Sequence, residues 1–286
     1  HQFPTLLRPR WAGRDFSWLA SAFDMTVGTQ LLSEGRWMPQ ELRLLEGFLP
    51  IGGVVVDAGA NIGGFAVPLS KHVGPDGEVA VFHAVAIPDC IKGAPFLQVH
   101  AFEPFRGIFQ ILTANCAING LISCYTYHNA LGDRKERRRL PSPGLNAIGN
   151  PSKSFVVEKV ASELLVHHDG RTEVVEVVRL DDKLDLARLD LIKIDVESAE
   201  FEVILGAERT IAIHRPLLYV EDSEADMETM TKPTRLMNML GYRHAYECIN
   251  LYQSGMITMT SLLCGPKERT DETKSRLRAI DFRITT

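Results

Sequence analysis

The feature that most restricts the fold of this chain is a short apolar run followed at once by a glycine-bearing turn. Val54-Val55-Val56 shows no alternation of apolar and polar residues, which is typical of a parallel strand buried on both faces. The run leads directly into Asp57-Ala58-Gly59-Ala60-Asn61-Ile62-Gly63-Gly64. A buried strand that passes through such a turn into a helix is the opening unit of a parallel α/β sheet.

Similar units recur along the chain, each with an apolar strand, an acidic or turn residue at its carboxyl end and a helix after it. This alternation favours a mostly parallel sheet with helices on both faces, in which ligands bind at the carboxyl ends of the strands. The acids placed on this rim are Asp57, Glu103, Asp195 and Glu221. The predicted strands are 54–56, 99–102, 125–131, 189–194 and 217–220, and the predicted helices are 26–49, 62–71, 105–118, 199–211 and 231–240.

Two further strands are predicted after Gly241-Tyr242, near residues 243–248 and 256–263. The connection between them is too short for a helical crossover, so we expect them to pair antiparallel. The predicted fold class is therefore α/β, a Rossmann-like, doubly wound and mostly parallel seven-stranded sheet with an antiparallel terminal hairpin.

The length of 286 residues, 45% of them hydrophobic, suits one domain with elaborations. We expect an N-terminal helical extension over residues 1–50 that packs on the core, a ligand-binding domain over 51–264 and a charged, peripheral tail over 265–286. Two segments break the repeat. Residues 83–98 separate two strand-like pieces, of which 99–102 is the expected strand because it delivers Glu103 to the rim. Residues 132–174, with several prolines and glycines, predict a lid.

Composition excludes several classes of partner. The formal charge of −5 gives no general attraction to nucleic acid, and we expect the arginine run 134–139 to be a solvated loop.

The five cysteines include no C-x-x-C pair, which argues against a zinc site and a disulfide framework and favours a reducing, cytoplasmic compartment. No apolar stretch reaches the roughly 18 residues of a membrane span. No metal site is expected, oligomeric state is not predicted, and His1 in place of methionine leaves a shortened N-terminus open.

The glycine turn predicts the class of ligand. Gly59 and Gly63 allow positive φ and close approach to a ligand, and the following helix offers unpaired N–H groups. A nicotinamide dinucleotide would require the order G-x-G-x-x-G, whereas here Asp57 precedes the glycines. A carboxylate at this strand end suits the ammonium and sulfonium groups of S-adenosylmethionine. The candidate cofactor contacts in the turn are Asp57, Gly59, Ala60, Asn61 and Gly63.

Acids and amides further along the chain extend this hypothesis. Glu103 can accept hydrogen bonds from both ribose hydroxyls, which we favour over the alternative that it only caps the helix beginning near Phe105. Asn129 and Asp133 are weaker candidates for the adenine edge, since either can serve the turn at Gly132.

A third group of acids follows the strand that ends at Ile194. Asp195 is a candidate partner of the sulfonium, and Asp195 or Glu197 is a candidate general base for a substrate hydroxyl. Alternatively, Glu197 and Glu200 favour the N-terminus of the next helix, an interpretation that we prefer for Glu200 and leave open for Glu197.

These motifs together resemble the FkbM-type methyltransferases over residues 26–264. The resemblance implies a methyltransferase domain with S-adenosylmethionine as donor, Pro104 beside Glu103 in the cofactor site, and O-methylation of a hydroxyl on a sugar or other secondary metabolite, so that the partner is a small-molecule or glycan acceptor. The segments that carry it are 55–63, 101–104, Asn115 with Asn119-Gly120, 179–182, 190–197 and 215–221.

Two departures from the family motivate an alternative. The family usually has glycine where this chain has Ser198, and it lacks residues 83–98. Together with the absence of an obvious base, these departures are consistent with a non-catalytic S-adenosylmethionine-binding or assembly module of the same fold.

Overall fold

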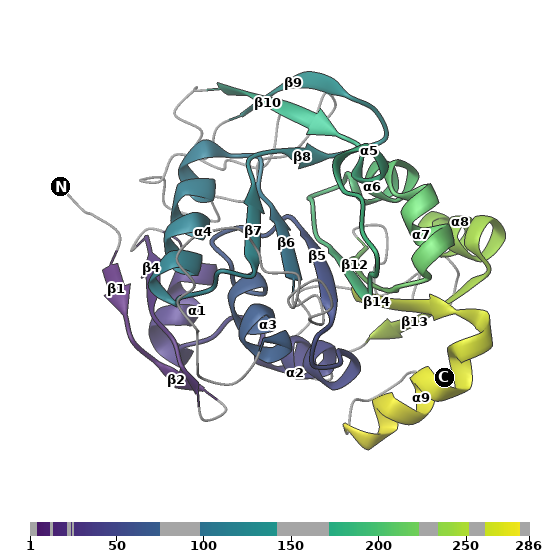
Figure 1. Ribbon diagram of the computed structural model, residues 1–286, viewed down its shortest axis with the longest axis horizontal. Helices are drawn as coiled ribbons and strands as arrows, with labels where there is room; N and C mark the ends of the chain where they lie inside the picture. The colour runs from purple at the N-terminus through teal and green to yellow at the C-terminus, as the bar shows by residue number, and fades with distance from the viewer. Residues whose placement is uncertain are drawn as a thin grey trace, which may run out of the picture.

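A seven-stranded sheet of order β13-β14-β12-β11-β5-β6-β7 forms the centre of the computed structural model (Figure 1). The structure describes residues 5–11, 14–21, 24, 26–74, 98–141, 172–222, 234–251 and 261–280. Within the sheet, β14 runs antiparallel to both of its neighbours, and the other pairs are parallel. The predicted fold class and terminal hairpin are confirmed. The strands are β5 (Val54–Ala58), β6 (Gln98–Phe102), β7 (Cys124–Tyr127), β11 (Leu191–Ile194), β12 (Leu217–Glu221), β13 (Tyr246–Leu251) and β14 (Ser261–Pro266).

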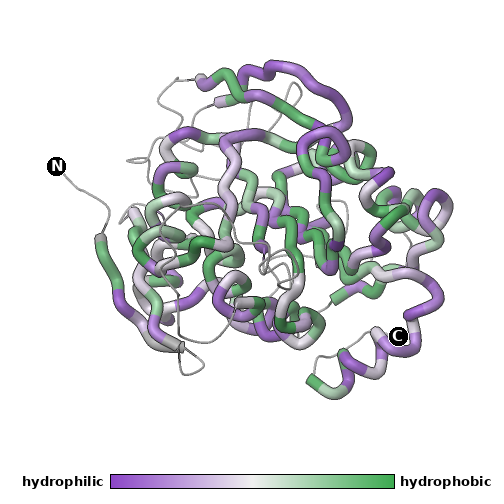
Figure 2. The backbone as a smooth tube through the Cα atoms, viewed as in Figure 1, coloured by the Kyte–Doolittle hydropathy of each residue, from purple (hydrophilic) through white to green (hydrophobic). Residues whose placement is uncertain are grey.

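Helices cover both faces of this sheet (Figure 1). Val55 of β5 packs into the core that includes α1 to α4, while Val54 and Val56 pack into the core of α6 to α8. Burial on both sides is why the strand is an unbroken valine run, and Figure 2 shows the central strands as largely hydrophobic. The helices are α1 (Val27–Glu34), α2 (Pro39–Phe48), α3 (Ala66–Val73), α4 (Arg106–Ile118), α5 (Leu180–Lys183), α6 (Glu200–Gly206), α7 (Glu208–His214), α8 (Arg235–His244) and α9 (Thr270–Ala279).

The turn after β5 has the backbone expected from its glycines. Gly59 has a φ of 79° and Gly63 a φ of 99°. A Cβ at Gly59 would lie 1.8 Å from the carbonyl oxygen of Asp195, so only glycine lets β5 and β11 approach this closely. Helix α3 begins at Ala66 rather than at residue 62, because residues 61–65 complete the turn.

The predicted strand 125–131 is divided between two sheets. β7 ends at Tyr127, and β8 (Ala130–Leu131) pairs with β10 (Thr172–Val178) in a three-stranded sheet of order β8-β10-β9. The arginine run expected as a loop lies instead largely in β9 (Glu136–Pro141), where backbone pairing with β10 orders it. Most of the predicted lid, 142–171, lies outside the described residues, as do residues 83–97 of the predicted insertion.

The N-terminal extension is not solely helical. β1 (Thr5–Leu7) pairs with β4 (Trp18–Ala20), and β2 (Arg10–Trp11) pairs with β3 (Arg14–Asp15). The single helix predicted over 26–49 is two helices, because Gly35 and Met38 adopt left-handed conformations with φ values of 72° and 41°. Proline at the first position of α2 then starts the second helix.

Three features of the chain after residue 199 also differ from prediction. α8 continues through Gly241-Tyr242 to His244, so these residues do not open a strand. The helix predicted over 199–211 is divided at Ala207 into α6 and α7. In the charged tail, α9 packs on the core through Leu277, which is fully buried.

The structure contains a disulfide that the spacing of the cysteines did not predict. Cys248 and Cys264 are direct cross-strand partners in β13 and β14 and form a disulfide. Sixteen residues separate them in sequence, and only the hairpin register brings them together. Because this disulfide is present, the cysteines no longer favour a reducing compartment. None of the helices that the structure describes is long and apolar enough to cross a membrane.

Candidate active site

A cavity that is partly open to solvent lies at the carboxyl ends of the central strands. Its walls come from the turn after β5, the residues after β6 and β11, the β7–β8 connection, the N-terminal segment and the three-stranded sheet. The lining residues are Val27, Trp37, Gly59, Ala60, Asn61, Gly64, Phe65, Phe102, Glu103, Pro104, Phe105, Asn129, Ala130, Leu131, Arg138, Leu140, Val177, Lys193, Asp195, Val196, Glu197 and Ala199.

The structure brings most of the predicted site residues to this cavity. Those that line it are Gly59, Ala60, Asn61, Glu103, Pro104, Asn129, Asp195 and Glu197. Asp57, Gly63 and Asp133 do not. Sequence reasoning missed the contributions of Val27, Trp37 and Arg138, which come from segments with no motif of their own.

Asp57 lies beneath the cavity surface rather than on it. Its side chain is fully buried, and Oδ1 lies 3.2 Å from Nζ of Lys193. Burial raises the pKa of Asp57, against the attraction of the Lys193 ammonium. The structure therefore places Asp57 behind the lining of the cavity, next to Lys193.

Lys193 connects the turn to the acidic rim. Besides its ion pair with Asp57, Nζ lies 3.4 Å from Oδ2 of Asp195 and donates a 2.8 Å hydrogen bond to the carbonyl of Gly59. Burial alone would lower the pKa of Lys193, but Asp195 and Asp57 raise it above its usual value. One signal could have found this residue, since it is the only charged residue within β11, although its pairing with Asp57 follows from the register of β11 against β5.

Glu103 joins the rim to the turn through backbone donors. Oε1 accepts the N–H of Phe105 at 2.9 Å, and Oε2 accepts the N–H of Asn61 at 3.1 Å. The capping contact at the start of α4 is therefore present. Each oxygen keeps a second lone-pair direction, so capping does not exclude ribose binding. Burial raises the pKa of Glu103 to about 7.

Asp195 and Glu221 lie side by side because they follow the paired residues of β11 and β12. Burial, a hydrogen bond with Asp195 and the charges of Asp195 and Glu197 raise the pKa of Glu221 to about 10. This environment favours the protonated form of Glu221, which supports Asp195 from behind the cavity.

The loop after β11 adopts a backbone that glycine would favour. Glu197 and Ser198 have φ values of 55° and 79°. Oε1 of Glu200 accepts the N–H groups of Val196 and Ser198 at 3.3 and 3.1 Å, so the structural interpretation of Glu200 is confirmed. Ser198 keeps the left-handed conformation even though a side chain disfavours it.

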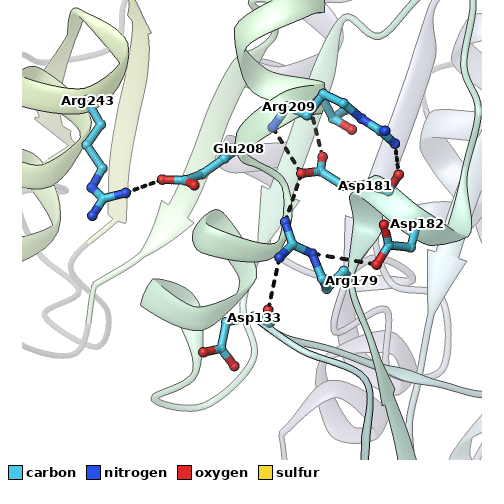
Figure 3. A network of polar contacts seen from close by, with 8 residues as sticks. Asp133, Arg179, Asp181, Asp182, Glu208, Arg209 and Arg243 are labelled. Carbon is cyan, nitrogen blue, oxygen red and sulfur yellow. Dashed lines mark hydrogen bonds and ion pairs between the residues drawn. The ribbon is translucent and has the colours of Figure 1, made fainter.

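The β7–β8 connection places Asn129 in the wall of the cavity. Its side chain is buried, and Nδ2 donates to Oε2 of Glu176 at 3.1 Å. Asp133 instead lies outside the cavity, where its carbonyl oxygen accepts from Arg179 at 3.4 Å (Figure 3).

The segment 179–182 forms a separate polar cluster, the Asp181 network (Figure 3). The Asp181 carboxylate accepts the N–H groups of Arg209 and Thr210 at the start of α7, at 3.0 and 2.9 Å, and contacts Arg179 at 3.3 Å. This family-like motif is therefore structural in this chain, since it fastens α5 to α7.

The model of the methyltransferase FkbM domain matches residues 57–248. The chain belongs to the FkbM methyltransferase family. The matched range includes the turn, Glu103 and the acids after β11, all of which contribute residues to the cavity. Members of this family are S-adenosylmethionine-dependent methyltransferases, which confirms the cofactor expected from the glycine turn.

Two curated relatives extend the comparison. The AMB antimetabolite synthetase AmbE of Pseudomonas aeruginosa is 24% identical over 94% of this FkbM chain and 13% of the relative. The methyltransferase sdnD of Sordaria araneosa is 27% identical over 56% of this chain and 62% of the relative. The chain thus spans less than two thirds of the length of either protein.

Two solved structures are among those that match this chain. An FkbM methyltransferase from Methylobacillus flagellatus matches with a TM-score of 0.46 and 19% identity, covering 77% of this chain and 47% of the other. M. jannaschii TYW2, solved in complex with AdoMet, matches with a TM-score of 0.43 and 14% identity, covering 93% and 87%.

The residues of this FkbM chain fit the cofactor. A buried carboxylate with spare lone pairs suits the ribose hydroxyls, and one ammonium between two carboxylates leaves excess negative charge for a cationic donor. Among the residues that the structure describes, no three His, Cys, Asp or Glu side chains are arranged to hold a metal ion.

Proposed function

We propose that this FkbM methyltransferase methylates a hydroxyl oxygen on a sugar or other secondary metabolite, with a small molecule or glycan as acceptor. The observation that carries the proposal is the single cavity in which the glycine turn, Glu103 and two rim acids meet. The name of one relative, an antimetabolite synthetase, supports a role in secondary metabolism.

In this proposal Glu103 accepts the ribose hydroxyls and Asn129 contacts the adenine edge. The backbone of residues 59–61 borders the donor, and Pro104 packs beside it, since all of them line the cavity. Asp195, close to Lys193 and Glu221, faces the sulfonium and ammonium groups. Asp57 acts through Lys193 and does not contact the donor.

Glu197 is proposed as the general base. It lines the same cavity as Asp195 but lies two residues further along the loop, where the left-handed backbone redirects the chain before α6. It accepts the hydroxyl proton while the acceptor oxygen bonds to the methyl carbon. S-Adenosylmethionine supplies an electrophilic methyl group, whose C–S bond breaks with the electron pair kept on sulfur. The cavity walls align the groups, which can contribute several kcal/mol.

Methyl transfer from labelled donor to a panel of hydroxylated acceptors tests this function. We expect E197Q to lower kcat by about 10²- to 10⁴-fold, the usual contribution of a positioned base, with the Kd for S-adenosylhomocysteine unchanged. D195N should instead weaken donor binding. Transfer only to nitrogen or carbon acceptors, or full activity in E197Q, would overturn the respective assignment. Measurable transfer of any kind excludes the non-catalytic module.

A further inference from the structure

Asn115 of α4 and Asn119, which caps the C-terminus of that helix, hold the N-terminal segment by its backbone. Oδ1 of Asn115 accepts the N–H of Leu19 at 2.6 Å, and Nδ2 donates to the carbonyl of Leu19 at 3.1 Å. Asn119 makes the same pair of hydrogen bonds with Ser17, at 3.0 and 2.6 Å. We call Asn115 and Asn119 the asparagine clamp.

The spacing of the clamp matches the strand that it binds. Four residues rise about 6 Å along a helix, and two residues span about 6.6 Å along a strand. Ser17 and Leu19 present their backbone groups to the same edge, because these groups alternate along an extended chain. β1 pairs with one edge of β4, and the clamp provides hydrogen-bond partners for backbone groups on the opposite edge of β4.

Asn115 has a contact that Asn119 lacks. Its second Nδ2 hydrogen is donated to the carbonyl of Ile62 at 2.8 Å, in the middle of the turn after β5. Nδ2 of Asn119 donates instead to the carbonyl of Asn115, within its own helix. The clamp therefore holds one strand at two points but contacts the turn at only one.

The carbonyl held by Asn115 belongs to the residue after Asn61, which lines the cavity in a left-handed conformation with a φ of 51°. The N–H of Asn61 is the group that binds Glu103. Asn115 is fully buried, and its three hydrogen bonds use one acceptor and both amide hydrogens. Its amide is thus rigidly oriented by two chain segments that are distant in sequence.

The N-terminal segment reaches the same turn by a second route. Val27 and Trp37 line the cavity, and a Cβ at Gly64 would lie 2.9 Å from Cδ1 of Trp37. The indole therefore packs directly against the backbone of the turn. Residues before β5 are a structural part of the cavity wall.

We propose that Asn115 is a positioning residue of the S-adenosylmethionine site, which fixes the turn at Ile62 and couples it to docking of the N-terminal segment. The inference rests on the proposed placement of the donor against residues 59–61. A turn held in its binding conformation before the ligand arrives avoids an ordering cost on binding. Asn119 holds the same segment without this link, which makes it a matched control.

Calorimetric titration of the full chain with S-adenosylhomocysteine, combined with thermal unfolding, tests the inference. N115A and N119A should both lower Tm, since each removes two bonds to the N-terminal segment. N115A should weaken binding about five- to tenfold, the effect of about one hydrogen bond, whereas N119A should change it less than twofold. N115D, which keeps the side-chain volume and the bond to the Leu19 N–H, should weaken binding as N115A does, which separates loss of the donor from loss of packing.

Equal loss of affinity in N115A and N119A would overturn the inference, because the effect would then come from docking alone. Unchanged affinity in folded N115A or N115D would also overturn it. If the wild type itself does not bind S-adenosylhomocysteine, the donor placement in the proposed function fails and the inference fails with it. Binding that responds as expected without methyl transfer to hydroxylated acceptors would refute only the proposed acceptor chemistry.

Discussion

Two groups of buried carboxylates in this protein behave in opposite ways. In the Asp181 network, burial alone would raise the pKa of Asp181, but hydrogen bonds from the N–H groups of Thr210 and Arg209 lower it below its usual value. At the cavity rim, burial raises the pKa of Glu103 to about 7 and that of Glu221 to about 10.

The difference lies in the charged groups around each carboxylate, because Glu103 and Asp181 each accept two backbone N–H groups. Asp181 is surrounded by two backbone N–H groups and a guanidinium, so its charge is compensated and serves stability. The rim acids have neighbours of like charge and share a single ammonium, Lys193. Carboxylates left undercompensated in a cavity are typical of a site that completes its interactions with a ligand.

The largest expected effect is that of K193M. Removing the ammonium leaves the buried Asp57 and the half-buried Asp195 without their cation. Loss of one partner from a buried ion pair, here Asp57–Lys193, typically costs about 3–5 kcal/mol. We expect the free energy of unfolding in urea to fall by about that amount and binding of S-adenosylhomocysteine to be lost. The cost should shrink at acidic pH, where Asp57, whose pKa is raised by burial, becomes protonated.

K274M provides the control, because Lys274 forms an exposed ion pair with Glu247 that should contribute less than about 1 kcal/mol. Equal free energies of unfolding in K193M and K274M would show that the rim acids do not need the Lys193 ammonium. The charge compensation at the rim would then not differ from that in the Asp181 network.

The next effect is that of D181A on stability alone. Two N–H groups at the start of α7 lose their acceptor, at about 1–3 kcal/mol for each buried donor left unsatisfied. We expect a loss of about 3 kcal/mol in the free energy of unfolding, with the Kd for S-adenosylhomocysteine unchanged. Because the folded pKa of Asp181 is lowered, its stabilisation is present above its usual pKa and is lost as pH falls through the folded value.

The stability difference between wild type and D181A should therefore narrow at acidic pH, as measured by unfolding at several pH values. A clear change in the affinity for S-adenosylhomocysteine would show that the Asp181 network is not separate from the site.

The third prediction concerns the pH dependence of donor binding. Because the folded pKa of Glu103 is raised, the contribution of Glu103 to the free energy of unfolding decreases as pH rises from about 4.5 to about 7. The contribution of Asp181 changes with pH in the opposite direction. Ribose hydroxyls donate to the ionised form, so ligand binding should favour ionisation. We expect affinity for S-adenosylhomocysteine to increase about tenfold between pH 6 and pH 8, following the fraction of Glu103 that is ionised.

E103Q cannot ionise and should bind weakly at all pH values, without this increase. A slope that persists in E103Q would assign the titration to another group. Calorimetry at matched ionic strength measures both.

The sequence predicted those parts of the fold and cavity that depend on local patterns. The valine run, the glycines and Glu103 at the end of β6 lie within short segments whose order fixes their position on the rim. The break between α1 and α2 lies between Gly35 and Pro39, two signals in the sequence that the prediction of one helix over 26–49 did not use. Met38 adopts a left-handed conformation that tertiary contacts must impose.

Contacts between distant segments could not be predicted from local patterns. The Lys193 ammonium is placed by the register of β11 against β5, the Cys248–Cys264 disulfide by a hairpin register, and the Asn115 contacts by packing of α4 against β4. The arginine run is a strand only because β10 pairs with it. Each of these depends on tertiary pairing that one sequence does not display.

The smallest expected effect is that of E221Q, which tests whether the raised pKa at the rim is functional. Protonated Glu221 shares a hydrogen bond with Asp195, and an amide N–H of glutamine can take the same donor role. In E221Q we expect kcat and the Kd for S-adenosylhomocysteine to stay within about twofold of wild type. E221A removes the donor and should lower kcat and raise this Kd by more than that. Equal defects in E221Q and E221A would show that Glu221 acts as a charged carboxylate, and the rim would then resemble the Asp181 network more closely than its pKa indicates.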